Sequence, residues 1–146
     1  MSWRGAMSWR GAWLLPLLIG CYLGGRTDGP TATLGSLQRD VFAQRCTAAC
    51  HSGGENAAGG LDMSGDLHAA FVGVPASAPA CAGIPAPRVV PGDPARSLLY
   101  IKVAAKRDGT VVPCGDTMPL GPDLPALSAD EVELVRRWIE AGALND

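Results

Sequence analysis

Apolar residues recur at helical intervals in four short stretches of this chain, and polar segments rich in Gly and Pro separate them. The pattern predicts helices over about 36–45, 66–72, 94–106 and 128–141. No segment alternates apolar and polar residues well enough to predict a β-strand. The expected fold class is therefore all-α, a small domain of about four short helices with long Gly/Pro-rich loops.

Capping residues mark the last two predicted helices. Asp93 and Pro94 fit an N-cap followed by proline at the first helical position. Ser128 and Glu131 fit a capping box, in which each side chain bonds to the backbone amide of the other. Gly142 is a suitable residue to end the last helix. The apolar face of that helix consists of Val132, Val135, Trp138 and Ile139.

Residues 1–20 have the pattern of a secretory signal peptide, because two arginines precede an apolar run from Trp13 to Ile19. This run is too short to span a bilayer as a helix. The segment leads into Leu-Ile-Gly-Cys21, which resembles a bacterial lipobox whose cysteine is acylated and anchors the protein to a membrane. An ordinary signal peptide with a nearby cysteine is the alternative. The tandem hexamer MSWRGA leaves Met7 as a second candidate start.

Composition suggests a tethered domain with a modest core. Residues 21–35, rich in Gly and Thr, are typical of a flexible tether, and the folded domain is expected over 36–146. The chain has 19 Gly and 12 Pro but only two Phe and two Tyr, which favours stabilisation by a cofactor or cross-links. Removal of residues 1–20 leaves 10 basic and 14 acidic residues, a formal charge of −4. Nucleic-acid binding has no support, because the sequence contains no basic run.

Cys46, Cys50 and His51 form a Cys-x-x-x-Cys-His motif. In a c-type haem site, two cysteines form thioethers with the vinyl groups of one haem, and the histidine after the second cysteine binds the iron. The usual spacer has two residues, whereas this one has three small residues. The same positions also fit a disulfide near a helix end, or half of a zinc site that needs further ligands.

Met118 is the candidate ligand for the other side of the iron, because haem iron in cytochromes c is often held by His and Met. Pro119 biases Met118 toward an extended conformation, which suits a loop that holds a sulfur at a fixed point. A methionine that only fills a core gap is the alternative. Met63 and His68 are the competing ligands, although Met63 follows His51 closely and His68 suits a packing or surface role better.

Cys81 and Cys114 remain as a distant pair. An exported, oxidising setting permits a disulfide between them, worth on the order of 3 kcal/mol through loop entropy. It would hold the Pro-rich segment 73–92 against the loop that carries Met118. Two unpaired thiols are the alternative.

The order of these elements resembles that of cytochrome c domains common in planctomycetes and myxobacteria, over roughly residues 38–143. Besides the Cys-x-x-x-Cys-His motif, the resemblance rests on Gly59-Gly-Leu-Asp62, Val89-Val-Pro-Gly-Asp-Pro94, Ser97-Leu-Leu99, Met118-Pro, Leu127-Ser-Ala-Asp-Glu131 and Trp138-Ile-Glu-Ala-Gly-Ala143. It implies a cytochrome c fold and one covalent haem c on Cys46 and Cys50. It also implies His51 as the proximal and Met118 as the distal iron ligand.

The sequence thus predicts an exported electron carrier that serves redox partner proteins and has no small-molecule substrate. We expect it in the cell envelope or periplasm of a Gram-negative bacterium, attached to the membrane through a lipid on Cys21. His51 is expected to donate its other ring N–H to a backbone carbonyl, and Trp138 to pack near the haem. Arg88 either pairs with a propionate or stays solvated. A haem-less, disulfide-stapled lipoprotein acting as an interaction module is the alternative function.

Overall fold

The structure, a computed structural model, describes residues 32–48 and 50–146. The predicted signal segment 1–20, Cys21 and most of the tether 21–35 lie outside the described residues, as does Ala49 in the cysteine spacer. The described chain is helical and contains no β-strand, only two isolated bridges, which confirms the all-α prediction. Within these ranges no helix has the length and apolar character needed to cross a bilayer.

The first helix begins two residues before its predicted start. α1 (Leu34–Leu37) starts with a capping box, in which Thr33 Oγ1 accepts from Ser36 N at 3.0 Å and Ser36 Oγ accepts from Thr33 N at 3.2 Å. The chain then continues as a ten-residue π-helix, Gln38–Thr47. Its i→i+5 hydrogen bonds make each turn wider than an α-helical turn.

The π register determines which side chains of this helix face the core. Leu37, Val41, Phe42 and Cys46 are related as i, i+4, i+5 and i+9. An α-helix advances about 100° per residue and would place i and i+9 on opposite faces. A helix with more than four residues per turn places all four on one face. The first three are at most 1% exposed and Cys46 packs against their cluster, so the wider register turns Cys46 inward.

The third predicted helix is interrupted at Ser97. Asp93 caps a short 3₁₀ turn, Pro94–Arg96, and α3 (Leu98–Asp108) begins only after Ser97, which is extended. The fully buried Ser97 hydroxyl donates to the carbonyl of Asp93 and accepts from the Val90 amide at 2.9 Å. These side-chain bonds replace helical backbone bonds, so the prediction of one continuous helix was wrong here.

The last helix, α4 (Ala129–Glu140), confirms its sequence signals. Ser128 N donates to Glu131 Oε2 at 2.7 Å, and Glu131 N donates to Ser128 Oγ at 3.2 Å, as a capping box requires. Gly142 follows with a φ of +103°, and its amide donates to the Ile139 carbonyl. This left-handed residue ends the helix as predicted.

The remaining elements are short. α2 (Leu67–Phe71) lies within the predicted range 66–72, and the side chain of Asp66 caps it by accepting from Ala69 N. Three further 3₁₀ turns lie in the loops, at Gly54–Asn56, Ala58–Gly60 and Pro79–Cys81.

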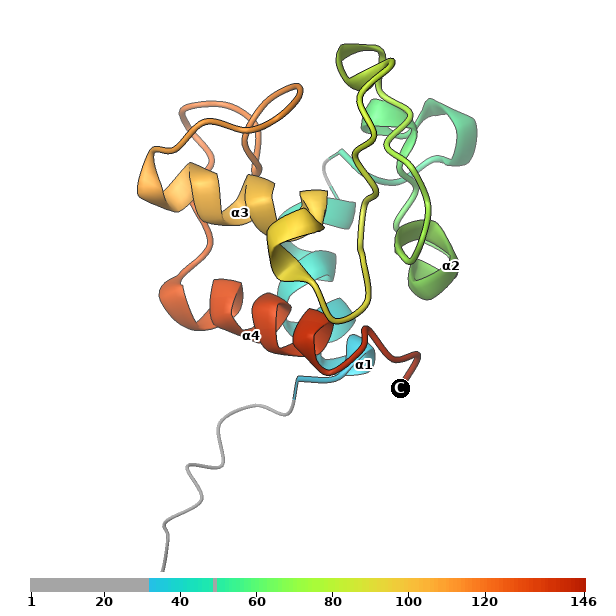
Figure 1. Cartoon of the computed structure of the whole chain (residues 1–146), viewed down its shortest axis with the longest axis vertical. Coiled ribbons are helices and arrows are strands. Elements are labelled where there is room, and N and C mark those ends of the chain that lie inside the picture. The colour runs from blue at the N-terminus through green and yellow to red at the C-terminus, as the bar shows by residue number, and fades with distance from the viewer. Residues whose placement is uncertain (1–31, 49) are drawn as a thin grey trace, which may run out of the picture.

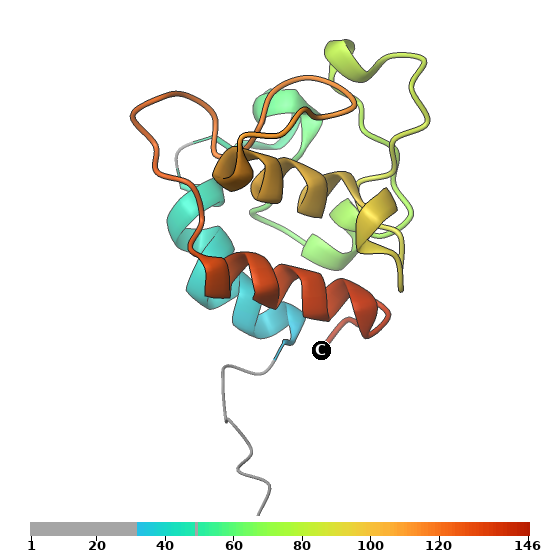
Figure 2. The same cartoon turned by 60° about the vertical axis from the view of Figure 1, so that its left-hand side comes forward.

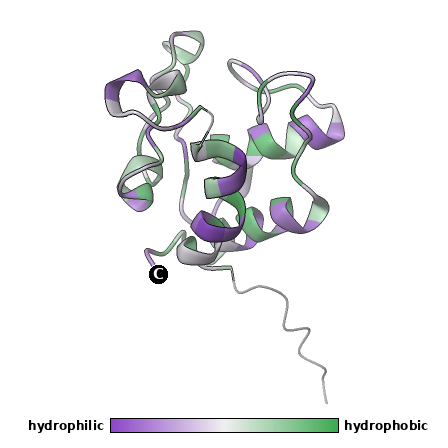
Figure 3. Cartoon of the chain, turned by 180° about the vertical axis from the view of Figure 1, so that it is seen from behind, coloured by the Kyte–Doolittle hydropathy of each residue, from purple (hydrophilic) through white to green (hydrophobic). Residues whose placement is uncertain are grey.

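The helices pack around one main core. α3 and α4 lie one above the other, and α1 with the π-helix crosses behind them (Figures 1 and 2). Each of these helices carries polar and apolar stretches (Figure 3), and the apolar residues of α4 are the buried ones. Trp138 is 1% exposed and donates from Nε1 to the Leu144 carbonyl. The long loops lie at the end of the domain away from α1 (Figure 1).

Candidate haem site

A cavity of about 280 Å³ opens between the end of the π-helix, α3 and the long loops. This volume is close to the lower end of ligand cavities, which run from roughly 300 to 1,000 Å³. Cys46, His51 and Met118 all line it, so the structure brings three of the four predicted haem residues to one cavity. The rest of the lining is mainly apolar and includes Leu61, Met63, Phe71, Leu98, Leu99 and Val103.

The His51 ring is oriented by a backbone carbonyl, as the sequence led us to expect. Its Nδ1 lies 3.2 Å from the carbonyl oxygen of Leu61. A carbonyl oxygen only accepts, so this contact places the proton on Nδ1 and leaves the Nε2 lone pair available to a metal. The His51 carbonyl in turn accepts from Met63 N at 2.7 Å, which holds this loop beside the histidine.

A wide backbone turn closes the motif. His51 N donates to the Cys46 carbonyl at 3.1 Å, an i→i+5 bond of the kind found in the π-helix that ends at Thr47. The Cys50 carbonyl accepts from Ala58 N at 3.0 Å, which attaches the second cysteine to the following loop. One backbone hydrogen bond therefore connects Cys46 to His51 across the three-residue spacer.

Both cysteines of the motif are unpaired thiols in the structure. Cys46 is half-buried, and this burial raises its pKa to about 11, while Cys50 is exposed. The disulfide considered for Cys46 and Cys50 does not form. Among residues 32–48 and 50–146, no three His, Cys, Asp or Glu side chains converge as a zinc site requires. A haem iron held by one histidine and one methionine would not require such a cluster.

Met118 enters the cavity from the loop that follows α3. It is half-buried against the main core, and its amide donates to the Lys102 carbonyl at 3.2 Å. Pro119 directly after it is buried. The loop is thus packed onto α3 at the residue that carries the sulfur.

The competing ligands are placed differently. Met63 lines the same cavity and is 3% exposed, but its amide is bonded to the His51 carbonyl, which holds it beside the histidine. His68 is not among the lining residues, and its Nε2 lies 3.0 Å from the Ala143 carbonyl. His68 is half-buried, in keeping with the packing or surface role that we expected. Trp138 is also absent from the lining, so its predicted place in the core is confirmed but it does not contact the cavity.

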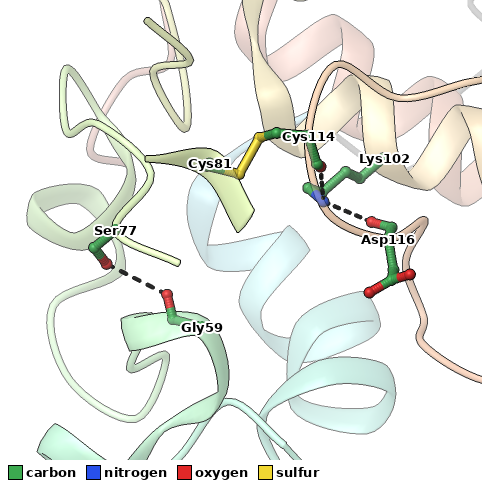
Figure 4. Close-up of a disulfide and its surroundings, with 6 residues drawn as sticks. All are labelled: Gly59, Ser77, Cys81, Lys102, Cys114 and Asp116. Carbon is green, nitrogen blue, oxygen red and sulfur yellow. Dashed lines mark hydrogen bonds between the residues drawn. A yellow bond between two sulfur atoms is a disulfide. The ribbon is translucent and has the colours of Figure 1, made fainter. Parts of the chain in front are cut away.

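The predicted disulfide between Cys81 and Cys114 is present, with Cα atoms 5.1 Å apart (Figure 4). Both residues are buried and form a small second core with Leu98 and Ala86. Cys81 also lines the cavity. The bond therefore joins the Pro-rich segment to the loop that leads to Met118.

Two cations border the cavity, and only one of them, Arg88, was considered from the sequence. Arg88 was expected mainly at the solvated surface, but it lines the cavity and donates to the carbonyls of Ala70 and Gly60 at 2.9 and 2.8 Å. Lys102 of α3 lines the cavity as well. Burial lowers the pKa of both groups. Two cations at an apolar cavity suit a flat apolar ligand that carries acid groups, as haem does.

No protein-family model, curated protein or solved structure matches this chain. The chemistry of the site therefore has to be argued from its own geometry.

Proposed function

We propose that the chain is a monohaem c-type cytochrome that transfers electrons, with its iron bound by His51 and Met118. The observation that carries this proposal is the meeting of both residues at one apolar cavity, with the His51 Nδ1 engaged and its Nε2 available. Cys46, an unpaired thiol, lines the same cavity. This donor set is the one used by cytochromes c.

Several residues of the chain would hold a haem, each through a different contact. The haem, when bound, supplies the one-electron couple of its iron. Cys46 and Cys50 would hold its periphery as thioethers, and Leu61 orients His51 through the ring N–H. Met118 would supply a soft thioether, which raises the reduction potential relative to harder ligands. The mainly apolar lining would offer the haem ring an apolar surface.

Electron transfer is favoured over catalysis by the same ligand set. If His51 and Met118 both bind the iron, no coordination site remains for a substrate. The proposed partners are therefore redox proteins that meet the domain at its surface.

The proposed location is the envelope or periplasm of a Gram-negative bacterium. Residues 1–20 would direct export, Cys21 would carry the lipid anchor, and residues 21–35 would serve as the tether. The Cys81–Cys114 disulfide supports an oxidising compartment, where such bonds persist.

The decisive experiment is expression of the full chain together with a c-type cytochrome maturation system. The purified protein is reduced and denatured, and its pyridine haemochrome spectrum and intact mass are recorded. We expect a c-type haemochrome band and a mass increased by one haem. The variant carrying Cys46→Ser and Cys50→Ser serves as the control and should lack both. A wild-type chain of unmodified mass without the band refutes the proposal.

A second function is favoured by a different observation. The disulfide joins two loops at one end of the domain, and Val111, on the same loop as Cys114, is 93% exposed. A haem-less lipoprotein that binds another protein through these loops would share both features. The haemochrome measurement separates the two functions, because this alternative carries no haem.

A further inference from the structure

Two lysines of α3 hold the loop that carries Met118. Lys102 Nζ donates to the carbonyl of Cys114 at 2.8 Å and to the carbonyl of Asp116 at 2.6 Å (Figure 4). Lys106, one turn further along α3, donates from Nζ to the carbonyl of Gly121 at 2.7 Å. The lysines thus hold the loop on both sides of Met118.

Lys102 binds the loop through its backbone as well as its side chain. Its carbonyl accepts from Met118 N at 3.2 Å, so one residue of α3 is bonded to three positions of the loop. Bonds from an ammonium group to carbonyl oxygens are stronger than bonds between neutral groups. A lysine that served only solubility would keep its ammonium in water, whereas the Lys102 side chain lines the cavity.

The loop is shaped for this close approach. Gly115 has a φ of +61°, which disfavours other residues, and a Cβ added there would lie 3.2 Å from Lys102 Nζ. A side chain at this position would therefore crowd the ammonium group. The disulfide fixes the loop only at Cys114, and the part from Asp116 to Gly121 is held by the two lysines besides the packing of Met118 and Pro119.

We propose that Lys102 and Lys106 form a lysine clasp that positions the Met118 sulfur, with Lys102 as the principal positioning residue. This proposal rests on the proposed function, because it concerns the ligand of the haem iron. Groups that orient a metal ligand typically change metal affinity by roughly 10–100-fold when they are removed. Without the clasp, Met118 would leave the iron more readily and an added ligand would replace it more easily.

The test uses the haem-loaded full chain and imidazole as the competing ligand. Imidazole is titrated against the ferric protein, and loss of the sulfur-to-iron absorption band reports displacement of Met118. We expect Lys102→Leu to lower the apparent dissociation constant of imidazole about tenfold, which corresponds to about 1.4 kcal/mol. Lys102→Arg, which keeps a charged donor, should restore a value close to wild type.

The matched control removes a different cation from α3. Arg107 pairs with Asp108 at 3.5 Å and is exposed, so Arg107→Gln should leave imidazole binding unchanged. Gly115→Ala perturbs the same contact from the loop side and should act in the direction of Lys102→Leu. It replaces that variant if Lys102→Leu fails to fold. Imidazole binding like that of wild type in the folded variant, with haem attached, overturns the clasp and leaves the cytochrome proposal intact.

Hydrogen exchange in the haem-free protein supplies a readout that does not depend on iron. Amides of residues 114–121 should exchange faster in Lys102→Leu than in wild type or Arg107→Gln. Equal exchange rates also overturn the clasp. A wild-type chain that takes up no haem overturns the positioning role together with the proposed function, and the haemochrome spectrum identifies that outcome.

Discussion

His51 and Met118 reach one cavity from separate parts of the chain, the first just beyond the π-helix and the second from the loop after α3. Neither element provides both residues, so the cavity depends on the packing of loop against helix. The backbone bond between Met118 and Lys102 shows where that packing is made.

Met118→Ala should abolish the sulfur-to-iron absorption band while the haem stays covalently attached, because the thioethers do not depend on Met118. Met63→Leu is the control, since it replaces the other cavity methionine with a residue of similar volume. Visible and near-infrared spectra of both variants give the answer. A band that survives Met118→Ala and disappears in Met63→Leu would transfer the distal role to Met63.

The two motif thiols should differ in reactivity in haem-free, reduced protein. Cys50 is exposed and should be alkylated by iodoacetamide before the half-buried Cys46. Burial raises the Cys46 pKa to about 11, so its reactive thiolate is scarce at pH 8 and increases about tenfold per pH unit up to that value. Mass spectrometry of time points between pH 7 and pH 10 measures both rates. Equal rates at pH 8 would show that Cys46 does not face the core.

Replacement of both Cys81 and Cys114 by Ser should lower the free energy of unfolding by about 3–4 kcal/mol, because the bond closes a loop of 33 residues. Urea denaturation of the haem-free protein measures this loss. Ser52→Ala, at an exposed position, is a control expected to stay within about 0.5 kcal/mol of wild type. A double variant as stable as wild type would contradict the role assigned to the bond.

Cys21→Ser should release the protein from the membrane fraction without affecting haem attachment. The expected reason is loss of the acyl chains that anchor the tether, while the motif cysteines remain. Metabolic labelling with a radioactive fatty acid and cell fractionation measure the two effects. Unchanged labelling of the variant would show that Cys21 is not the lipid site.

Local signals in the sequence predicted much of the fold. Ser128 and Glu131 lie three residues apart and satisfy each other's amides, so the start of α4 could be located without any other part of the chain. The break at Ser97 could not be predicted, because its cause is a contact with the preceding loop at Val90. Leu37, Val41 and Phe42 alone are compatible with a short α-helical stripe, so they did not reveal the π register, which also brings Cys46 to their face.

The sequence indicated candidate site residues only where the chemistry of the side chain itself suggested a role. The side-chain chemistry of Cys46, His51 and Met118 suggested a haem site, and the structure brings these residues to one cavity. Arg88 was considered only as a propionate partner or a solvated residue, and Lys102 was not considered, because the partners of both are backbone carbonyls, which every residue has and no motif records. The disulfide was predictable because Cys81 and Cys114 were the two cysteines left without another role.

The hydrogen bond from His51 to Cys46 bears on how such sites are found in genomes. A pattern search counts the residues between the two cysteines. The structure connects Cys46 to His51 by one i→i+5 backbone hydrogen bond, which spans a spacer of three residues. An additional spacer residue then changes the sequence motif, but the hydrogen bond still connects Cys46 to His51. Searches that require two residues between the cysteines would miss this chain, which has three. A search that allows a third spacer residue would retain this chain. Such a search could require apolar residues or cysteine at i, i+4, i+5 and i+9 in the preceding helix, as at Leu37, Val41, Phe42 and Cys46.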